Sequence, residues 1–108
     1  MIVAVCDDLQ ADRDVLVSYC KRYKDEYKMP MDILQFANAG ELLQSQQARA
    51  SDLIFLDIYM EGASGMDAAH ILRNKGFDGA IVFTTTSQEH YAQGYEVEAL
   101  HYLNKPVT

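Results

Sequence analysis

Acidic residues end two apolar segments of the sequence. The stretch LIFLDIYM, residues 53–60, places four large apolar residues directly before Asp57, and IVAVCDD, residues 2–8, leads into Asp7 and Asp8. A carboxylate at the end of an apolar strand costs free energy to desolvate unless a partner there needs its negative charge. We therefore expect these acids to bind a cation or to react.

Two further polar groups follow apolar segments in the same way. Three threonines end IVFTTT, residues 81–86, and Lys105 follows ALHYLN, residues 99–104. Clustered carboxylates raise one another's pKa unless a cation neutralises them, and several carboxylate oxygens with a carbonyl and waters suit Mg²⁺. An ammonium and a hydroxyl nearby suit an anion with several oxygens, such as a phosphoryl group.

Each of these residues also has an ordinary structural explanation. Asp8 alone could cap a helix, Asp57 alone could lie in a turn, and threonines favour strands. An isolated lysine such as Lys105 is usually solvated. We favour a shared site because all of these groups end successive apolar segments.

Five apolar segments are spaced as the strands of a parallel sheet. They cover residues 2–6, 31–37, 52–57, 80–85 and 99–104. In the third, the residues between Asp52 and Asp57 are continuously apolar, as in strands that are covered on both faces. Strands alternating with helices through right-handed crossovers predict a doubly wound α/β sheet. Such sheets bind ligands at the carboxyl ends of their strands, which is where the polar groups fall.

Helical patterns fill the intervals between these strands. Spacings of three and four residues predict a first helix whose buried face is formed by Leu16, Tyr19, Cys20, Tyr23 and Tyr27. Asn38 and Glu41 have capping-box spacing before a short second helix through residue 46. A third helix is expected from about Met66, and a poorer fourth helix after Thr86.

The composition indicates one folded domain. With 108 residues, 49% of them hydrophobic, the chain is long enough for its own core. A formal charge of −7 argues against direct binding to DNA or to an anionic membrane. The amino terminus lacks the pattern of a signal peptide or a membrane span. Cys6 and Cys20 have no metal-site spacing, which favours reduced, buried thiols in a cytoplasmic protein.

These motifs resemble the receiver domain of two-component response regulators. The resemblance rests on VCDD, LIFLDIYM, Gly65 eight residues after Asp57, IVFTTT and ALHYLNKP. The CDD start, EVEAL and ALHYLNKP are similar to receivers that carry LytTR-type DNA-binding output domains. The family implies a flavodoxin-like sheet of five parallel strands in the order 2-1-3-4-5.

The resemblance implies a phosphorylation site. Asp57 would accept a phosphoryl group from the phosphohistidine of a sensor histidine kinase, and so form an acyl phosphate. Mg²⁺ would bind Asp8, Asp57 and the backbone carbonyl of Tyr59, with Asp7 acting largely through water. A bulky side chain at Tyr59 would also shield the acyl phosphate.

The same resemblance implies how the phosphoryl group is held and read out. The hydroxyl of Thr85 would bond one phosphoryl oxygen, and Lys105 would pair with another. Thr85 and Tyr102 would form the switch that changes the surface around the fourth and fifth strands. The domain would assist its own phosphorylation and dephosphorylation without being an enzyme in its own right. DNA would be reached only through an output domain outside this chain.

Two features depart from the family pattern. Receivers usually have proline four residues after the phosphoacceptor, and here that residue is Glu61. The sequence also ends shortly after Lys105, where receivers continue into a fifth helix. We therefore expect residues 1–108 to form a receiver domain truncated before that helix. An uncovered fifth strand would expose apolar side chains, which favours a homodimer.

Three other functions share parts of this pattern. A haloacid dehalogenase-like phosphatase needs its nucleophile on the first strand with a second Asp two residues later, but Asp57 ends the third strand and is followed at that position by Tyr59. A flavodoxin-like FMN-binding domain needs a phosphate loop where Asp7 and Asp8 would repel a phosphate. The third is a pseudo-receiver that binds partners without phosphorylation. The intact set of Asp7, Asp8, Asp57, Thr85 and Lys105 argues against it, whereas Glu61 and the missing fifth helix keep it open.

Overall fold

The computed structural model describes residues 1–86, 97–105 and 107. Its strands are β1 (Ile2–Cys6), β2 (Asp32–Phe36), β3 (Leu53–Asp57), β4 (Ala80–Thr85) and β5 (His101–Asn104). Its helices are α1 (Gln10–Tyr27), α2 (Ala39–Gln44), α3 (Gln46–Arg49) and α4 (Gly65–Asn74). The five predicted strands are present, with ends shifted by at most two residues. The helix predicted after Thr86 falls mainly on residues 87–96, outside the described residues.

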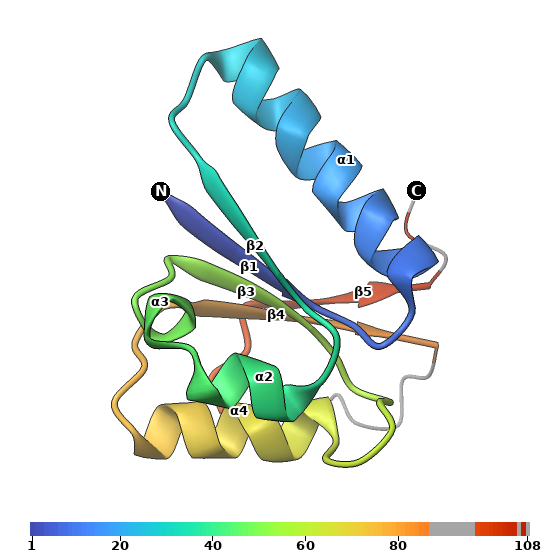
Figure 1. Ribbon diagram of the computed structural model, residues 1–108, viewed down its shortest axis with the longest axis vertical. Coiled ribbons are helices and arrows are strands. Elements are labelled where there is room, and N and C mark those ends of the chain that lie inside the picture. The colour runs from blue at the N-terminus through green and yellow to red at the C-terminus, as the bar shows by residue number, and fades with distance from the viewer. Residues whose placement is uncertain (87–96, 106, 108) are drawn as a thin grey trace.

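The strands form one parallel sheet in the order β2-β1-β3-β4-β5 (Figure 1). This order confirms the predicted fold. Cys6 of β1 is paired with Leu56 of β3, so the residues that follow them, Asp7 and Asp57, lie level with each other. Asp57 is in turn paired with Thr84 of β4. The register of three central strands therefore brings their polar ends to one edge of the sheet.

Helices cover both faces of the sheet. Helix α1 lies on one face, and α2, α3 and α4 lie on the other (Figure 1). Alternate residues of each strand supply the two cores: Cys6 and Leu56 pack with α2–α4, whereas Val5 packs with α1. Cys6 and Cys20 are both free thiols and both buried, as predicted. Parallel strands buried on two faces explain the continuous apolar segments of the sequence.

The prediction that the tyrosines of the first helix are buried is wrong. Tyr19, Tyr23 and Tyr27 expose 36%, 46% and 61% of their surfaces. The side chains that α1 buries are Leu16, Val17 and Cys20. Tyr19 and Tyr23 line an apolar groove between α1 and the sheet, and the end of α1 extends beyond the amino ends of the strands (Figure 1). Tyr23 and Tyr27 instead pack against each other, with ring centroids 4.5 Å apart.

The predicted second helix is two short helices. The side chain of Asn38 accepts a hydrogen bond from the Glu41 N–H at 2.8 Å, as the capping-box spacing predicts. Glu41 accepts in return from the N–H of Ala37 at 3.0 Å, one residue earlier than in a standard capping box. Ser45 then interrupts the helix, and its hydroxyl caps α3 by accepting from the Ala48 N–H at 3.1 Å.

Candidate phosphorylation and metal site

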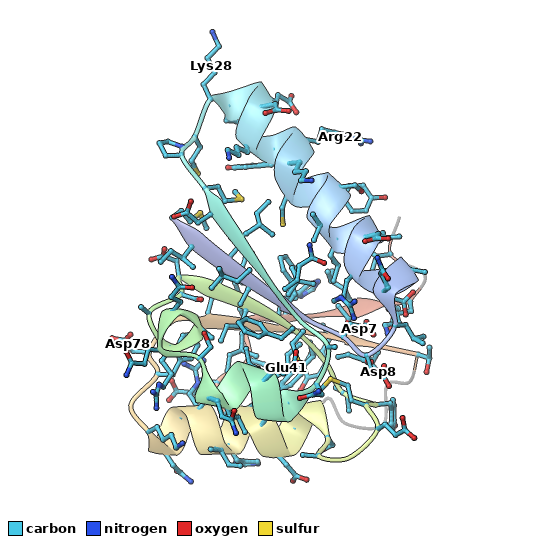
Figure 2. All side chains as sticks on the ribbon, viewed as in Figure 1. Asp7, Asp8, Arg22, Lys28, Glu41 and Asp78 are labelled. Carbon is cyan, nitrogen blue, oxygen red and sulfur yellow. The ribbon has the colours of Figure 1, made fainter. Side chains whose placement is uncertain are left out.

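Three carboxylates meet where β1 and β3 end. Asp7 follows β1, Asp57 is the last residue of β3, and both side chains are buried, whereas Asp8 is exposed. Each of the three residues places an oxygen within 4.8 Å of the others. Figure 2 shows Asp7 and Asp8 between the end of β1 and the start of α1. The three acids predicted to share a site therefore lie close together.

Lys105 brings a positive charge to these acids. It follows β5, and its Nζ lies 2.9 Å from Asp7 Oδ2 and 3.4 Å from Asp57 Oδ1. A third carboxylate, Asp12 Oδ2 in the first turn of α1, lies 3.0 Å from the same nitrogen. The lysine is thus held among three carboxylates rather than solvated at the surface.

The surroundings shift the pKa values of two groups. Burial raises the pKa of Asp57 from its ordinary value to about 6, and the charge of Asp7 adds to this effect, while Lys105 and the Tyr59 N–H lower it. Burial alone would lower the pKa of Lys105, but hydrogen bonds to Asp7 and Asp12 and the charge of Asp57 outweigh it and raise that pKa. The lysine therefore stays charged. Its charge only partly offsets the burial of Asp57 and the negative charge of Asp7, so the pKa of Asp57 remains raised.

The loop after β3 folds back over Asp57. Tyr59 donates its N–H to Asp57 Oδ1 at 3.3 Å, and Gly65 donates to the carbonyl of Ile58 at 2.9 Å. A Cβ atom on Gly65 would lie 2.0 Å from the Asp57 carbonyl oxygen, so only glycine fits this close approach. Gly65, one of the residues on which the family resemblance rests, thus has a steric role at the site.

Asp8 does not cap the first helix. The residue in the cap position is Leu9, which makes no side-chain cap, and its N–H donates to Asp7 Oδ1 at 3.0 Å. Asp8 Oδ2 instead accepts from the Glu61 N–H at 3.3 Å. This bond requires a residue other than proline at position 61, because proline has no N–H. Glu61 therefore links the loop to the acidic cluster.

The hydroxyl residues of β4 face different surroundings. Thr85 is fully buried at the end of the strand, and its carbonyl accepts from the Lys105 N–H at 2.8 Å. Thr84 lines a cavity of about 50 Å³ together with Asp7, Asp12 and Lys105. In the part of the chain that the structure describes, the buried Thr84 hydroxyl has no hydrogen-bond partner. Thr84, and not Thr85, therefore lines this cavity together with the lysine.

Tyr102 lies one strand away from these threonines. Its ring stacks on Phe83, with centroids 5.4 Å apart, and the two residues are paired between β4 and β5. Because Phe83 precedes Thr85 by two residues, Tyr102 is on the same face of the sheet as Thr85. The two predicted switch residues therefore lie on the same face of the sheet, on neighbouring strands.

The sequence of this chain matches the model of a known protein family. The family model of the response regulator receiver domain matches residues 3–108. This chain belongs to the response regulator receiver domain family.

Relatives of this receiver domain include longer bacterial regulators. It is 35% identical over 104 residues to the sensory transduction protein LytT of Bacillus subtilis, covering 96% of this chain and 42% of LytT. It is 36% identical over 105 residues to LytT of Bacillus cereus, covering 96% of this chain and 41% of that protein. The predicted resemblance to LytTR-type regulators is thus confirmed, and the chain spans about two fifths of their length.

Solved response regulator structures share the fold of this receiver domain. TrrA of Thermotoga maritima, solved in complex with Mg²⁺-BeF, matches with a TM-score of 0.80 at 25% identity, covering 96% of this chain and 85% of TrrA. The chemotaxis protein CheY4 of Vibrio cholerae matches with a TM-score of 0.82 at 24% identity, covering 99% and 88% of the two chains. The second likeness bears on the fold alone.

Sequence patterns missed Asp12 as a neighbour of Lys105, and among the three threonines the family resemblance selected Thr85 and not Thr84. Asp12 is five residues after Asp7, in the first turn of α1. Acids are common at this position of a helix because the helix dipole stabilises them there, so Asp12 alone does not indicate a site. The useful signal would have been its place in the turn that directly follows the acidic strand end.

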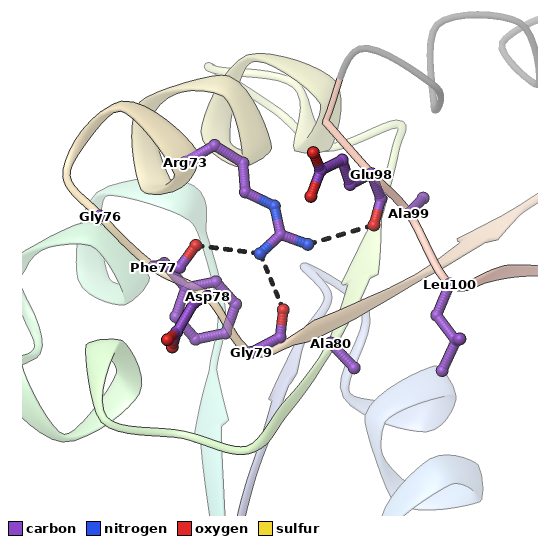
Figure 3. Close-up of a pocket in the computed structure, with 9 residues that line it drawn as sticks. All are labelled: Arg73, Gly76, Phe77, Asp78, Gly79, Ala80, Glu98, Ala99 and Leu100. Carbon is purple, nitrogen blue, oxygen red and sulfur yellow. Dashed lines mark hydrogen bonds between the residues drawn. The ribbon is translucent and has the colours of Figure 1, made fainter.

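Arg73 organises the opposite end of the receiver sheet. There a cavity of about 740 Å³ lies between the start of β4 and residues 98–100. The guanidinium of Arg73 donates to the carbonyls of Phe77, Gly79 and Glu98 (Figure 3) and to that of Val97 at 2.7 Å. Because backbone carbonyls use its donors, Arg73 acts as a structural clamp and not as an anion site.

No helix in the described residues combines the length and the apolar character that crossing a membrane requires.

Proposed function

We propose that this receiver domain accepts a phosphoryl group on Asp57 from the phosphohistidine of a sensor histidine kinase. The observation that carries the proposal is the position of Asp57, which is buried at a strand end, 3.4 Å from Lys105 Nζ, beside two further carboxylates. A phosphoacceptor needs this combination of an anionic oxygen and nearby groups that stabilise negative charge.

The acidic cluster is suited to hold Mg²⁺. Two of its three carboxylates are buried, and Asp57 has a raised pKa, so a divalent cation would offset their repulsion. Asp8, Asp57 and the carbonyl of Tyr59 would bind the ion, with Asp7 acting largely through water. When bound, Mg²⁺ neutralises charge on the transferred group. The solved complex of TrrA with Mg²⁺-BeF supports this part of the proposal.

The transfer itself requires few groups from the protein. An oxygen of Asp57 attacks phosphorus, the P–N bond to the kinase imidazole breaks, and its electron pair stays with the leaving nitrogen. Lys105 binds one oxygen of the transferred group and the Thr85 hydroxyl binds another. Movement of Thr85 would be accompanied by movement of Tyr102, which lies on the same face of the neighbouring strand. This movement changes the surface of β4 and β5.

The whole protein would use this switch to control a transcriptional output. We infer that residues 1–108 are the receiver domain of a longer, cytoplasmic regulator whose output domain contacts DNA, as its LytT relatives are more than twice its length. An apolar groove of about 360 Å³ between α1 and the sheet, lined by Leu16, Phe55 and Leu103 among others, would be covered by a fifth helix or by a second copy. The gene sequence beyond the codon for Thr108 tests this inference, which expects it to encode a fifth helix and an output domain.

Labelling with acetyl phosphate tests the phosphoacceptor. The native chain with Mg²⁺ should gain one phosphoryl group, detected by intact-mass spectrometry, and Asp57→Asn should gain none. Asp78→Asn, which removes an exposed acid at the far end of β4, is the matched control and should be labelled like the native chain. Labelling that persists in D57N, or a native chain that is not labelled, would contradict the proposal.

A further inference from the structure

Asp12 connects the first helix to the phosphorylation site. It lies in the first turn of α1, and its Oδ2 is 3.0 Å from Lys105 Nζ, although the two residues are 93 positions apart in sequence. The lysine side chain is 15% exposed and the aspartate side chain 36%. This pair is therefore partly shielded from solvent at the edge of the site.

The ammonium of Lys105 is shared unequally among its partners. An ammonium has three N–H donors, and three carboxylates surround this one. Asp7 and Asp12 lie 2.9 and 3.0 Å from Nζ, whereas the proposed phosphoacceptor, Asp57, lies 3.4 Å away. Of these partners only Asp12 belongs to α1, and it lies closer to the ammonium than Asp57 does.

The carboxylates around Lys105 bring more negative charge than its ammonium can balance. Asp7, Asp12 and Asp57 each place an oxygen within 3.4 Å of Nζ, and Asp8 adds a further carboxylate beside Asp7 and Asp57. The guanidinium of Arg13 donates at 2.7 Å to the carbonyl oxygen of Asp7 and not to its carboxylate. An incoming phosphoryl group adds further negative charge and needs Lys105 as a partner. Asp12 both repels that group and competes with it for the same ammonium.

We infer that Asp12 is a positioning residue that holds Lys105 in the unphosphorylated arrangement and so restrains phosphorylation of Asp57. This inference rests on the proposed function. It assigns opposite effects to the two near partners of the lysine: Asp7 belongs to the acidic cluster suited to Mg²⁺, whereas Asp12 lies outside that cluster. Removing the charge of Asp12 should therefore favour the phosphorylated state.

Beryllofluoride binding measures this effect without turnover. Calorimetric titration of the Mg²⁺-saturated chain should show that Asp12→Asn binds beryllofluoride at least about threefold more tightly than the native chain, the scale of a partly exposed ion pair. Asp14→Asn, which removes an exposed acid two residues further along α1, is the matched control and should bind like the native chain. Asp12→Glu, which keeps the negative charge, should bind beryllofluoride with an affinity closer to that of the native chain than to that of D12N.

Salt separates a charge effect from a structural one. Because the Asp12–Lys105 pair is partly exposed, raising the ionic strength should narrow the difference between D12N and the native chain. Melting temperatures close to the native value would show that D12N is folded.

The two proposals can fail separately. If the native chain binds beryllofluoride and D12N binds equally or more weakly, Asp12 does not restrain the site, and this inference is wrong while the proposed function stands. If the difference persists unchanged at high salt, competition for the ammonium is also wrong. If neither chain binds, both the proposed function and the inference are overturned.

Discussion

At the scale of single residues, Asp57 holds its proton more tightly than an ordinary aspartate. It is 3% exposed, it faces Asp7, and Lys105 is shared with two other acids. Desolvation and like charge both disfavour the carboxylate, and the lysine offsets only part of this cost. The resulting pKa of about 6 makes the fold sensitive to pH when no cation is bound.

The pH dependence of stability follows from this pKa. The ordinary value is 3.8 and the folded value about 6, so between these values the folded chain binds more protons than the unfolded chain. In EDTA, the contribution of Asp57 to the free energy of unfolding should fall as pH rises through that window. Asp57→Asn should match the native chain near pH 4 and exceed it by on the order of 2 kcal/mol at pH 7.5.

Urea denaturation in EDTA at the two pH values measures both differences. Asp78→Asn should show no comparable gain at pH 7.5, because that acid is exposed. Equal stabilities of D57N and the native chain at pH 7.5 would mean that Asp57 is not destabilised by its surroundings.

At the scale of elements, Arg73 ties α4 to the strands on either side of the 87–96 segment. Its side chain donates to carbonyls in the turn before β4 and in residues 97 and 98 before β5. It also lies over the ring of Phe77, 5.4 Å from the centroid. The planar guanidinium is suited to this task because its donors point in several fixed directions at once.

Replacing Arg73 by lysine should destabilise the fold. An ammonium has three donors on one atom and cannot reach carbonyls on both sides, which leaves some of them without a partner. We expect Arg73→Lys to lower the free energy of unfolding by about 1–3 kcal/mol, measured by urea denaturation. Arg49→Lys, at an exposed position in α3, should change it little. Equal effects of the two substitutions would show that the clamp contributes nothing.

At the scale of the whole molecule, the acidic edge of the sheet is a source of instability that a divalent ion can relieve. The chain has a formal charge of −7, and three of its acids lie within one small cluster. A ligand that binds the folded chain and not the unfolded chain raises the melting temperature. Magnesium should therefore stabilise the molecule as a whole.

Thermal melting with and without Mg²⁺ tests this coupling. At 10 mM Mg²⁺ the native chain should melt about 5 °C higher than in EDTA. Asp8→Asn should be more stable than the native chain in EDTA and should gain less from Mg²⁺. Asp78→Asn, which removes an exposed acid outside the acidic cluster, should gain as much from Mg²⁺ as the native chain if the ion binds at the site and does not act by general screening. A melting temperature that does not respond to millimolar Mg²⁺ would refute a metal site here.

The sequence by itself determined the fold and the main acids of the site. Apolar segments that end in acids or precede a lysine can be recognised locally, because strand burial and the carboxyl-end rule depend on periodicity and chain order. Asp7, Asp8, Asp57 and Lys105 were found in this way, and the sheet order brings them together.

Only the tertiary structure decided what depends on how elements pack. The position of α1 over the sheet leaves its tyrosines exposed and brings Asp12 to Lys105, a residue 93 positions away. The unpartnered hydroxyl of Thr84 and the four carbonyls around Arg73 are likewise set by packing. Local patterns predict which face of an element is apolar, but the tilt and length of a helix relative to the sheet determine which polar atoms meet.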